Sequence, residues 1–414
     1  MKTIFWLLDI NYELAEDKPE IWIWGIDNEG KRILIIDRNF LSYFYLVLQE
    51  KISPQTVIEA IQSQKTNYPS IVNLEGVEKR FFGKPVKAIK VFVQNPDLIL
   101  KYSGDFKKLE GIEDCLEDDI RYSMRYLIDN NVTPCSWHQI EVEETENKLE
   151  ARTDKVCLAK SFPKAIEKTE MPQLRILAIS TIAYSQQGSP KPEKNPVVII
   201  STITNAGEKK QFVAENFDDK PALDSFLKYV QDFDPDIIAG YNINRKDWPY
   251  LLARCKKLGI KLLVDRANTE PHTSVYGHVS LTGRADIDFF DFADELTEVK
   301  VKTLENVADF LDVMKVEKRT LIEDVEFASY WDDPKKRSML LKFSMENAQS
   351  IMGITSAMLD FAMQLSSLVG LPLDHVGAAA VGFRVEWYLI KQAYKIGELV
   401  PRRIERPYIP YAGS

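Results

Sequence analysis

The sequence predicts a mixed fold, α+β at its start and α/β further on, with a β-rich N-terminal domain, an α/β domain and a helical tail. Three observations predict it. Short β-rich runs separated by turn residues fill the chain from Thr3 to about Ile140. After about residue 170, strand and helix patterns alternate, as they do around a central sheet. From about Lys335 onward, helical periodicity dominates.

The N-terminal domain is assigned to residues 1–140. Its first strands are the runs TIFWLLDINY, EIWIWGI and RILIID. Ser53 and Pro54 predict the start of a helix, because serine favours the N-cap and proline the first turn. Phe81–Pro85 predicts a hairpin turn, and residues 120–130 predict an amphipathic helix.

Three further segments follow. Residues 141–170 are charged and weakly periodic, which predicts a linker or an added hairpin at a domain boundary. Residues 171–350 contain the strand runs LRILAIST, VVIISTIT and DIIAG and the helix ALDSFLKYVQDF. Residues 351–414 are predicted to be a helical segment that ends in an extended stretch, Pro407–Ser414.

Composition limits the function classes. Acidic residues exceed basic ones by 62 − 53 = 9, so the whole molecule repels a phosphate backbone, and contact with nucleic acid must come from local basic groups. The four cysteines and four histidines show no metal-ligand spacing, so neither a zinc site nor a disulfide framework is expected. No apolar run approaches the ~18 residues that span a bilayer, so a cytoplasmic protein with no membrane partner is expected.

Three segments have the framework of a metal-dependent nuclease: Leu174–Ala183, Asp234–Leu251 and Lys342–Gly353. A two-metal nuclease needs several converging carboxylates, because ions roughly 3.5–4 Å apart must activate water and stabilise the leaving oxygen. Hard divalent ions prefer charged oxygen ligands. Two acids at positions i and i+2 of a strand would share one face.

With the tail that begins at Gly370, these segments resemble family B DNA polymerases of the archaeal type, from about Leu8 to the C-terminus. The resemblance implies that residues 171–350 form a ribonuclease H-like domain of the DEDD exonuclease type. The family's first motif has Asp, any residue, Glu; here those positions are Ser180 and Ile182.

The other two motifs are also altered. The second keeps Asp247 but has Lys246 where the family has phenylalanine. In the third, the family's tyrosine and aspartate become Phe343 and Asn347. Isoleucine has no lone pair, and serine and asparagine carry no charge, so the resemblance implies that this domain binds no metal and has lost its nuclease activity.

Neighbouring acids leave one alternative open, an active 3′-5′ exonuclease with rearranged ligands. Glu346 precedes Asn347 by one residue, which on a helix turns its side chain by about 100° away from the direction of Asn347. Asp286, Asp288 and Asp291 lie on and after a predicted strand. Structural or surface roles are the simpler interpretation of all four.

The resemblance also implies a pocket that captures uracil from the template strand. A flipped base needs a narrow aromatic slot, with an arginine near its phosphate. Tyr122 and Arg125, at i and i+3, share a helix face. The alternative is that the tyrosines are packing groups and Arg125 a solvated charge. The positions implied by the resemblance are Tyr12, Ser42, Tyr43, Ile99, Tyr122 and Arg125.

Polymerisation in this family depends on palm aspartates, and no segment resembles SLYPSI-like or YGDTD-like motifs, although ERPYIPYAGS resembles the approach to that palm. No cofactor is therefore expected in this chain, and Mg²⁺ is expected only in the palm of a parent polymerase. The main hypothesis is the N-terminal and exonuclease-like portion of a polymerase, as a fragment or a split subunit, that binds primer–template or single-stranded DNA and a catalytic half. The alternative is a stand-alone pseudo-nuclease that binds DNA or protein.

Overall fold

The computed structural model describes residues 1–15, 18–274 and 277–403, so the predicted extended stretch Pro407–Ser414 lies outside the described residues. The chain forms two compact units, whose limits differ from the predicted boundaries at 140 and 170. The first unit comprises Met1–Asn11, Ile23–Ile36 and Thr133–Val385, and the second comprises Tyr12–Trp22, Asp37–Val132 and the chain from Glu386 onward.

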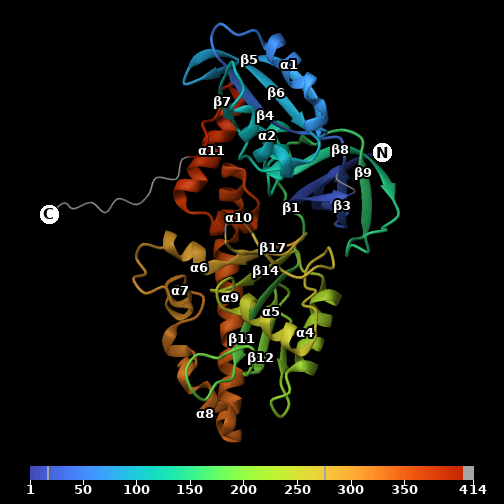
Figure 1. The fold of residues 1–414 in the computed structure, drawn as a ribbon. Helices are drawn as coiled ribbons and strands as arrows, with labels where there is room; N and C mark the ends of the chain where they lie inside the picture. The colour runs from blue at the N-terminus through green and yellow to red at the C-terminus, as the bar shows by residue number, and fades with distance from the viewer. Residues whose placement is uncertain (16–17, 275–276, 404–414) are drawn as a thin grey trace, which may run out of the picture. The chain divides into compact units, whose positions relative to one another are not determined.

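The N-terminal strands form a sheet that closes on itself, in the order β1-β2-β3-β9-β8-β10, with β8 also paired to β1 (Figure 1). The predicted segment 141–170 contributes to this sheet, which agrees with its interpretation as an added hairpin. The strands are β1 (Lys2–Ala15), β2 (Lys18–Asp27), β3 (Arg32–Asp37), β8 (Trp137–Thr145), β9 (Lys155–Ala159) and β10 (Lys164–Ala165).

The second unit contains a four-stranded sheet, in the order β5-β6-β4-β7. Side chains of β4 alternate between two apolar clusters, with Phe44 on the helix side and Tyr43 on the other. Helix α1 begins at Pro54 as predicted, but the Ser53 side chain makes no capping hydrogen bond, so that detail of the prediction was wrong. The elements are β4 (Ser42–Leu48), β5 (Ile71–Phe81), β6 (Lys84–Val93), β7 (Ile112–Leu116), α1 (Pro54–Ser63), α2 (Ile99–Phe106) and α3 (Tyr122–Asp129).

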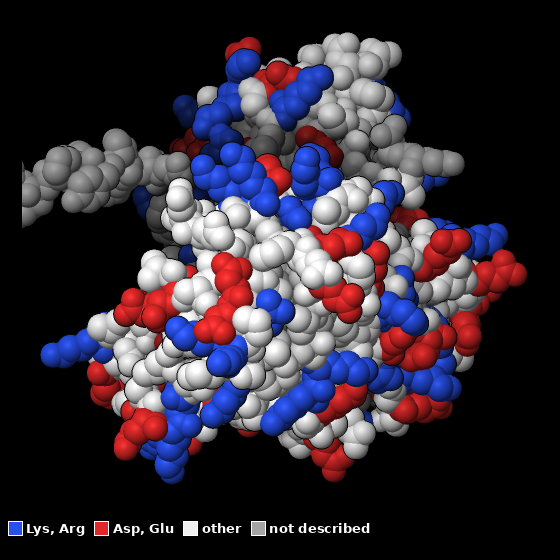
Figure 2. Space-filling view, turned by 90° about the horizontal axis from the view of Figure 1, so that it is seen from below, with Lys and Arg blue, Asp and Glu red and all other residues white. Residues whose placement is uncertain are grey.

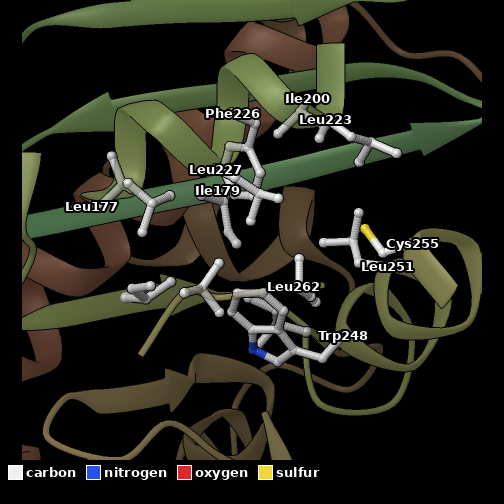
Figure 3. Close-up of a cluster of buried hydrophobic side chains, with 14 of the residues drawn as sticks. Leu177, Ile179, Ile200, Leu223, Phe226, Leu227, Trp248, Leu251, Cys255 and Leu262 are labelled. Atoms are coloured by element: carbon white, nitrogen blue, oxygen red, sulfur yellow. The ribbon is translucent and has the colours of Figure 1, made fainter. Parts of the chain in front are cut away.

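The sheet of the exonuclease-type domain has the order β13-β12-β11-β14-β17, with β11, β14 and β17 parallel to one another. One face packs against α4 and α5 through Leu177, Ile179, Phe226, Trp248 and Leu251 (Figure 3). The elements are β11 (Ile176–Ala183), β12 (Val197–Thr204), β13 (Lys209–Val213), β14 (Ile237–Gly240), β17 (Ala285–Asp288), α4 (Lys220–Phe233) and α5 (Asp247–Leu258).

Helix α9 (Pro334–Val369) packs against β11 and β12 on the other face of this sheet (Figure 1). It begins where Asp333 accepts a hydrogen bond from the backbone N–H of Lys335, and it ends at Gly370, whose φ of 85° only glycine adopts readily. By length and composition α9 is apolar enough to cross a membrane, and half of its most apolar stretch is buried inside the protein. The remaining elements are α6 (Phe289–Phe292), α7 (Leu304–Phe310), α8 (Phe327–Asp332), α10 (Leu373–Ala378), α11 (Val381–Lys395), β15 (His272–Thr273) and β16 (Val279–Ser280).

Candidate exonuclease-type site

Two of the five motif positions lie inside an apolar cluster. Ser180 and Ile182 leave β11 on one face, because they are two residues apart on a strand. Ile182 is only 2% exposed and Phe343, on α9, only 4%. Isoleucine and phenylalanine thus fill space where the family's motif has a glutamate and a tyrosine. The cluster, called the apolar seal below, comprises Ile182, Val198, Ile199, Ile322, Phe327, Trp331, Leu340 and Phe343.

A buried guanidinium lies beside the third motif. Arg319 donates from Nη2 to Oδ1 of Asn347 and from Nη1 to Oγ of Ser350, the latter over 3.3 Å. Burial lowers the pKa of Arg319, while the carboxylates of Glu305 and Glu346 oppose that shift. A fixed positive charge therefore stands next to the position where the family carries an acid.

The one surviving acid, Asp247, is the first residue of α5 and is buried. Its Oδ1 accepts a hydrogen bond from Oγ1 of Thr181. Thr181 lies between Ser180 and Ile182 on the strand, so its side chain leaves β11 on the opposite face. Burial raises the pKa of Asp247 to about 7, against the hydrogen bond from Thr181 and the charge of Lys246. The carboxyl group of Asp247 is thus hydrogen-bonded within the protein and is partly protonated at pH 7.

A tight loop between β14 and α5 sets the position of Asp247. A Cβ on Gly240 would lie 2.4 Å from Cβ of Ile243, so only glycine allows this turn. The hydroxyl of Tyr241 donates to the carbonyl of Lys302 over 2.7 Å. Gly240 and Tyr241 therefore serve the shape of the loop.

The acids on β17 are committed to structural hydrogen bonds. Asp288 accepts from the backbone N–H groups of Asn242 and Asn244, at 2.6 and 3.1 Å, which closes the same loop. Burial raises the pKa of Asp288 to about 6. Asp286 accepts from Nε1 of Trp248 over 3.0 Å, and burial raises its pKa well above the ordinary value.

The remaining two candidate acids also have internal partners. Asp291 forms an ion pair of 2.8 Å with Arg245. Glu346 accepts a hydrogen bond of 2.8 Å from the backbone N–H of Thr320. The contacts of these four acids thus lie with other groups of the described residues and not with Ser180, Ile182 or Asn347.

The residues present do not fit a pair of divalent ions. The five positions offer one hydroxyl, one amide, two apolar groups and a single carboxyl group that is bound to Thr181. In the part of the chain that the structure describes, no group of three potential metal ligands occurs at these positions. The neighbouring guanidinium of Arg319 further disfavours a cation.

A cavity of about 500 Å³ adjoins the site. Thr181, Arg245, Lys246 and Phe327 contribute to its lining. Lys246 stands where the family has phenylalanine. Its Nζ forms an ion pair of 3.1 Å with Asp324, and about half of its side chain is exposed. The site thus retains a recess with basic groups at its wall.

The template-base positions lie in the second unit but do not form one slot. Tyr12 and Tyr122 meet edge to face, with ring centres 5.5 Å apart. Tyr122 is buried, and its hydroxyl donates to the carbonyl of Phe40 over 2.5 Å. The hydroxyl of the half-exposed Tyr12 donates to Asp97 over 3.1 Å.

Tyr43 and Arg125 form a second group. Arg125 is only 2% exposed and forms an ion pair of 2.7 Å with Glu117. Its guanidinium lies 4.5 Å from the ring centre of Tyr43, whose hydroxyl donates to Asp129 over 2.7 Å. The interpretation of Arg125 as a solvated charge was therefore wrong.

Ser42 and Ile99 lie on the other side of β4. Ser42 donates to the carbonyl of Val93 over 2.6 Å, and Ile99 belongs to the apolar cluster that contains Phe44. Because neighbouring residues of a strand point to opposite faces, Ser42 and Tyr43 cannot line the same face of the sheet.

Arg319 and Thr181, which contact the motif positions, were not predicted from the sequence. Arg319 follows Glu317 and Lys318 in a charged, non-periodic run, and no local signal links it to a residue 28 positions away. Thr181 is the middle residue of the first motif. Strand alternation predicts that its side chain points away from those of Ser180 and Ile182, but nothing in the sequence predicts its contact with Asp247.

Comparison with known proteins agrees with this geometry. Residues 113–307 match the family model described as DNA polymerase family B, exonuclease domain. The chain corresponds to the N-terminal and exonuclease portion of an archaeal family B DNA polymerase. The family and the fold class predicted from the sequence are thereby confirmed.

Relatives match along nearly the whole chain. "DNA polymerase 2" of Aeropyrum pernix is 39% identical over 414 residues, which cover 99% of this chain and 52% of that protein. "DNA polymerase 3" of Saccharolobus shibatae is 32% identical over 406 residues, 97% of this chain and 52% of that protein. The solved structure of the family B DNA polymerase from Pyrobaculum calidifontis superimposes with a TM-score of 0.92 at 40% identity, covering 99% of this chain and 53% of that one. The chain spans about half the length of the curated relatives it matches.

Proposed function

We propose that this portion of a family B DNA polymerase holds single-stranded or primer–template DNA without cutting it and supports a catalytic polymerase part. The observation that carries the proposal is the apolar seal. Ile182 and Phe343 are both buried in it, so two positions of the former metal site are closed by hydrocarbon. Arg319 adds a permanent positive charge beside Asn347, which leaves no place for a divalent ion there.

The recess beside the seal is the proposed contact for a DNA strand. Arg245 and Lys246 line it and keep more than half of their side chains exposed. In Figure 2, Lys and Arg side chains are interspersed with Asp and Glu over most of the visible face. Since the net charge is −9, affinity for phosphates must arise locally, and these two cations are placed to provide it.

Binding measurements test the proposal. Fluorescence anisotropy with labelled single-stranded DNA is expected to show salt-dependent binding that is equal in EDTA and in Mg²⁺, because no metal takes part. Replacing both Arg245 and Lys246 by Gln is expected to weaken binding roughly tenfold and to reduce the salt dependence by about one phosphate contact per cation. Lys228→Gln, an exposed change on α4, is the matched control. No measurable affinity for DNA, or affinity that depends on Mg²⁺, would overturn the proposal.

Capture of a template uracil in the second unit is the second candidate function. The contact between half-exposed Tyr12 and buried Tyr122 favours it, because it supplies one aromatic wall. A base that entered there would have to displace Tyr122 from Phe40, and Arg125 is bound to Glu117. The structure thus supports DNA holding more strongly than base capture.

The alternative of a stand-alone pseudo-nuclease has less support. The matches to polymerases begin with the first residues and include the N-terminal strands, so the likeness is not confined to the exonuclease-type domain. Binding of the purified protein to primer–template junctions more tightly than to single strands would favour the polymerase portion.

A further inference from the structure

A group of three potential metal ligands lies in the first unit, away from the exonuclease-type motif positions. His278, Asp374 and His375 each offer one ligand atom, and these atoms all lie within 4.8 Å of one another. His278 immediately precedes β16, and the other two residues lie on α10. His278 and Asp374 are 3% and 6% exposed, so the group sits in the protein interior.

The distances match those of a coordination sphere. Nε2 of His278 lies 3.4 Å from Oδ2 of Asp374, and Nε2 of His375 lies 3.7 Å from the same oxygen. A tetrahedral ion bound at about 2.0–2.1 Å separates its ligand atoms by about 3.3–3.4 Å. The two distances to the carboxylate oxygen thus lie within a few tenths of an ångström of that spacing. The three ligand atoms all lie within 4.8 Å of one another, so a small movement of the side chains lets them share one cation.

Neighbouring hydroxyls orient these ligands. Oγ of Ser274 lies 2.8 Å from Nδ1 of His278, a contact that orients the ring so that Nε2 faces Asp374. Oγ of Ser280 donates to Oδ2 of Asp374 over 2.7 Å and lies 3.2 Å from Nε2 of His278. The Ser280 hydroxyl, or a water beside it, is thus placed for the fourth position.

From this geometry we propose that His278, Asp374 and His375 bind one Zn²⁺ ion. Imidazole nitrogens with one carboxylate oxygen in a compact, near-tetrahedral arrangement suit zinc better than Mg²⁺ or Ca²⁺, which require more oxygen ligands. The ion links the β15–β16 hairpin to α10, segments that are 96 residues apart in the sequence. Its role is structural, because buried ligands from distant segments fix the fold in which they lie.

The metal content of the purified protein tests this proposal. Protein prepared without a histidine tag, incubated with Zn²⁺ and passed over a desalting column, is expected to retain about one zinc per chain by mass spectrometry. Co²⁺ bound in place of zinc is expected to show the visible absorption of a tetrahedral ion. His278→Gln and His375→Gln are each expected to lower zinc affinity by roughly a hundredfold or more, and Ser274→Ala by roughly tenfold to a hundredfold.

His272 provides the matched control, because it is exposed, lies on β15 and is one of only four histidines in the chain. His272→Gln is expected to keep the full zinc content. Wild-type protein that retains no zinc and shows no zinc-dependent rise in melting temperature would overturn the proposal. Undiminished zinc in the His278→Gln and His375→Gln double variant would overturn it as well. Ser274→Ala leaves the three ligands intact, so it remains informative if a ligand variant fails to fold.

Discussion

Arg319 donates a hydrogen bond from its guanidinium to the side-chain oxygen of Asn347, 28 residues further along the chain. The family's third motif has an acid at the position of Asn347, which would meet a metal ion. Here the positive charge is supplied by the protein and held in place by Ser350 and Glu305. The side-chain oxygen of Asn347 is thus bound by a cationic group of the protein itself.

Asn347→Asp should convert the bond with Arg319 into an ion pair without creating a metal site. We expect the free energy of unfolding to rise by about 1 kcal/mol, since hydrogen bonds between charged groups are the stronger ones. Addition of Mg²⁺ should leave the melting temperature of this variant unchanged. Asn347→Ala, which removes the acceptor, should be destabilised instead. A melting temperature that rises with Mg²⁺ in Asn347→Asp would show that Arg319 does not exclude the ion.

Ile182→Glu should destabilise the protein severely, because it places a carboxylate among the side chains of the apolar seal. We expect the free energy of unfolding in urea to fall by about 3 kcal/mol or more. The control Ile182→Val removes one methyl group and should cost about 1 kcal/mol. Equal losses for the two variants would mean that the position is open to water.

Asp247 should make the stability depend on pH between about 4 and 7. Its pKa in the folded protein is about 7, raised from 3.8 by burial, so the folded state holds a proton that the unfolded chain releases. The stabilising effect of that proton is complete below about pH 4 and is lost as the pH rises through 7, by up to about 4 kcal/mol. Asp247→Asn should therefore raise the unfolding free energy at pH 8, raise it less at pH 5 and change it little at pH 4. Asp324→Asn, an exposed acid at the same cavity, is the control; the same gain in both variants would contradict the assignment.

His138 should make the protein less stable as the pH falls below about 6.5. Its Nε2 accepts a hydrogen bond from the backbone N–H of Thr133, and burial lowers its pKa from 6.5 to about 4. The unfolded chain therefore takes up a proton first, and stability falls by up to about 3 kcal/mol as the pH drops from 6.5 to 4. His138→Gln should flatten this part of the pH profile in urea titrations, whereas the exposed His272→Gln should leave it unchanged. A profile that keeps its slope in His138→Gln would assign the effect to other groups.

Single strands with and without one uracil should bind with equal affinity. Ser42 and Tyr43 point to opposite faces of the four-stranded sheet. Tyr122 is hydrogen-bonded to Phe40, and Arg125 is paired with Glu117. Tyr122→Ala should therefore change the stability of the second unit but not the ratio of the two affinities. Preference for the uracil strand that disappears in Tyr122→Ala would establish the base sensor.

The sequence was sufficient for the strand and helix pattern because its periodicities are strong. The runs at β1, β2, β3, β11 and β12 and the long helix α9 follow from alternating or continuous apolar residues. The loss of acidic residues at Ser180, Ile182 and Asn347 was also visible, because it depends only on residue identity.

The contacts made by Ile182, Phe343 and Asn347 could not be predicted from the sequence, because they join segments that are distant in the chain. The apolar seal joins residues 182 and 343, and the bond between Arg319 and Asn347 starts from a segment without periodicity. The same holds for His278 and His375, whose separation in the sequence gives no ligand spacing although the fold brings them together. The sequence of segment 141–170 left a linker and an added hairpin open, because its charged residues obscure strands that complete a sheet.

The most direct test of the central claim is a nuclease assay on the purified protein. A single strand labelled at its 5′ end should remain at full length during prolonged incubation with Mg²⁺ or Mn²⁺, and Asp247→Ala should behave identically. Shortening of the strand from its 3′ end by the wild-type protein, absent in Asp247→Ala, would contradict the account.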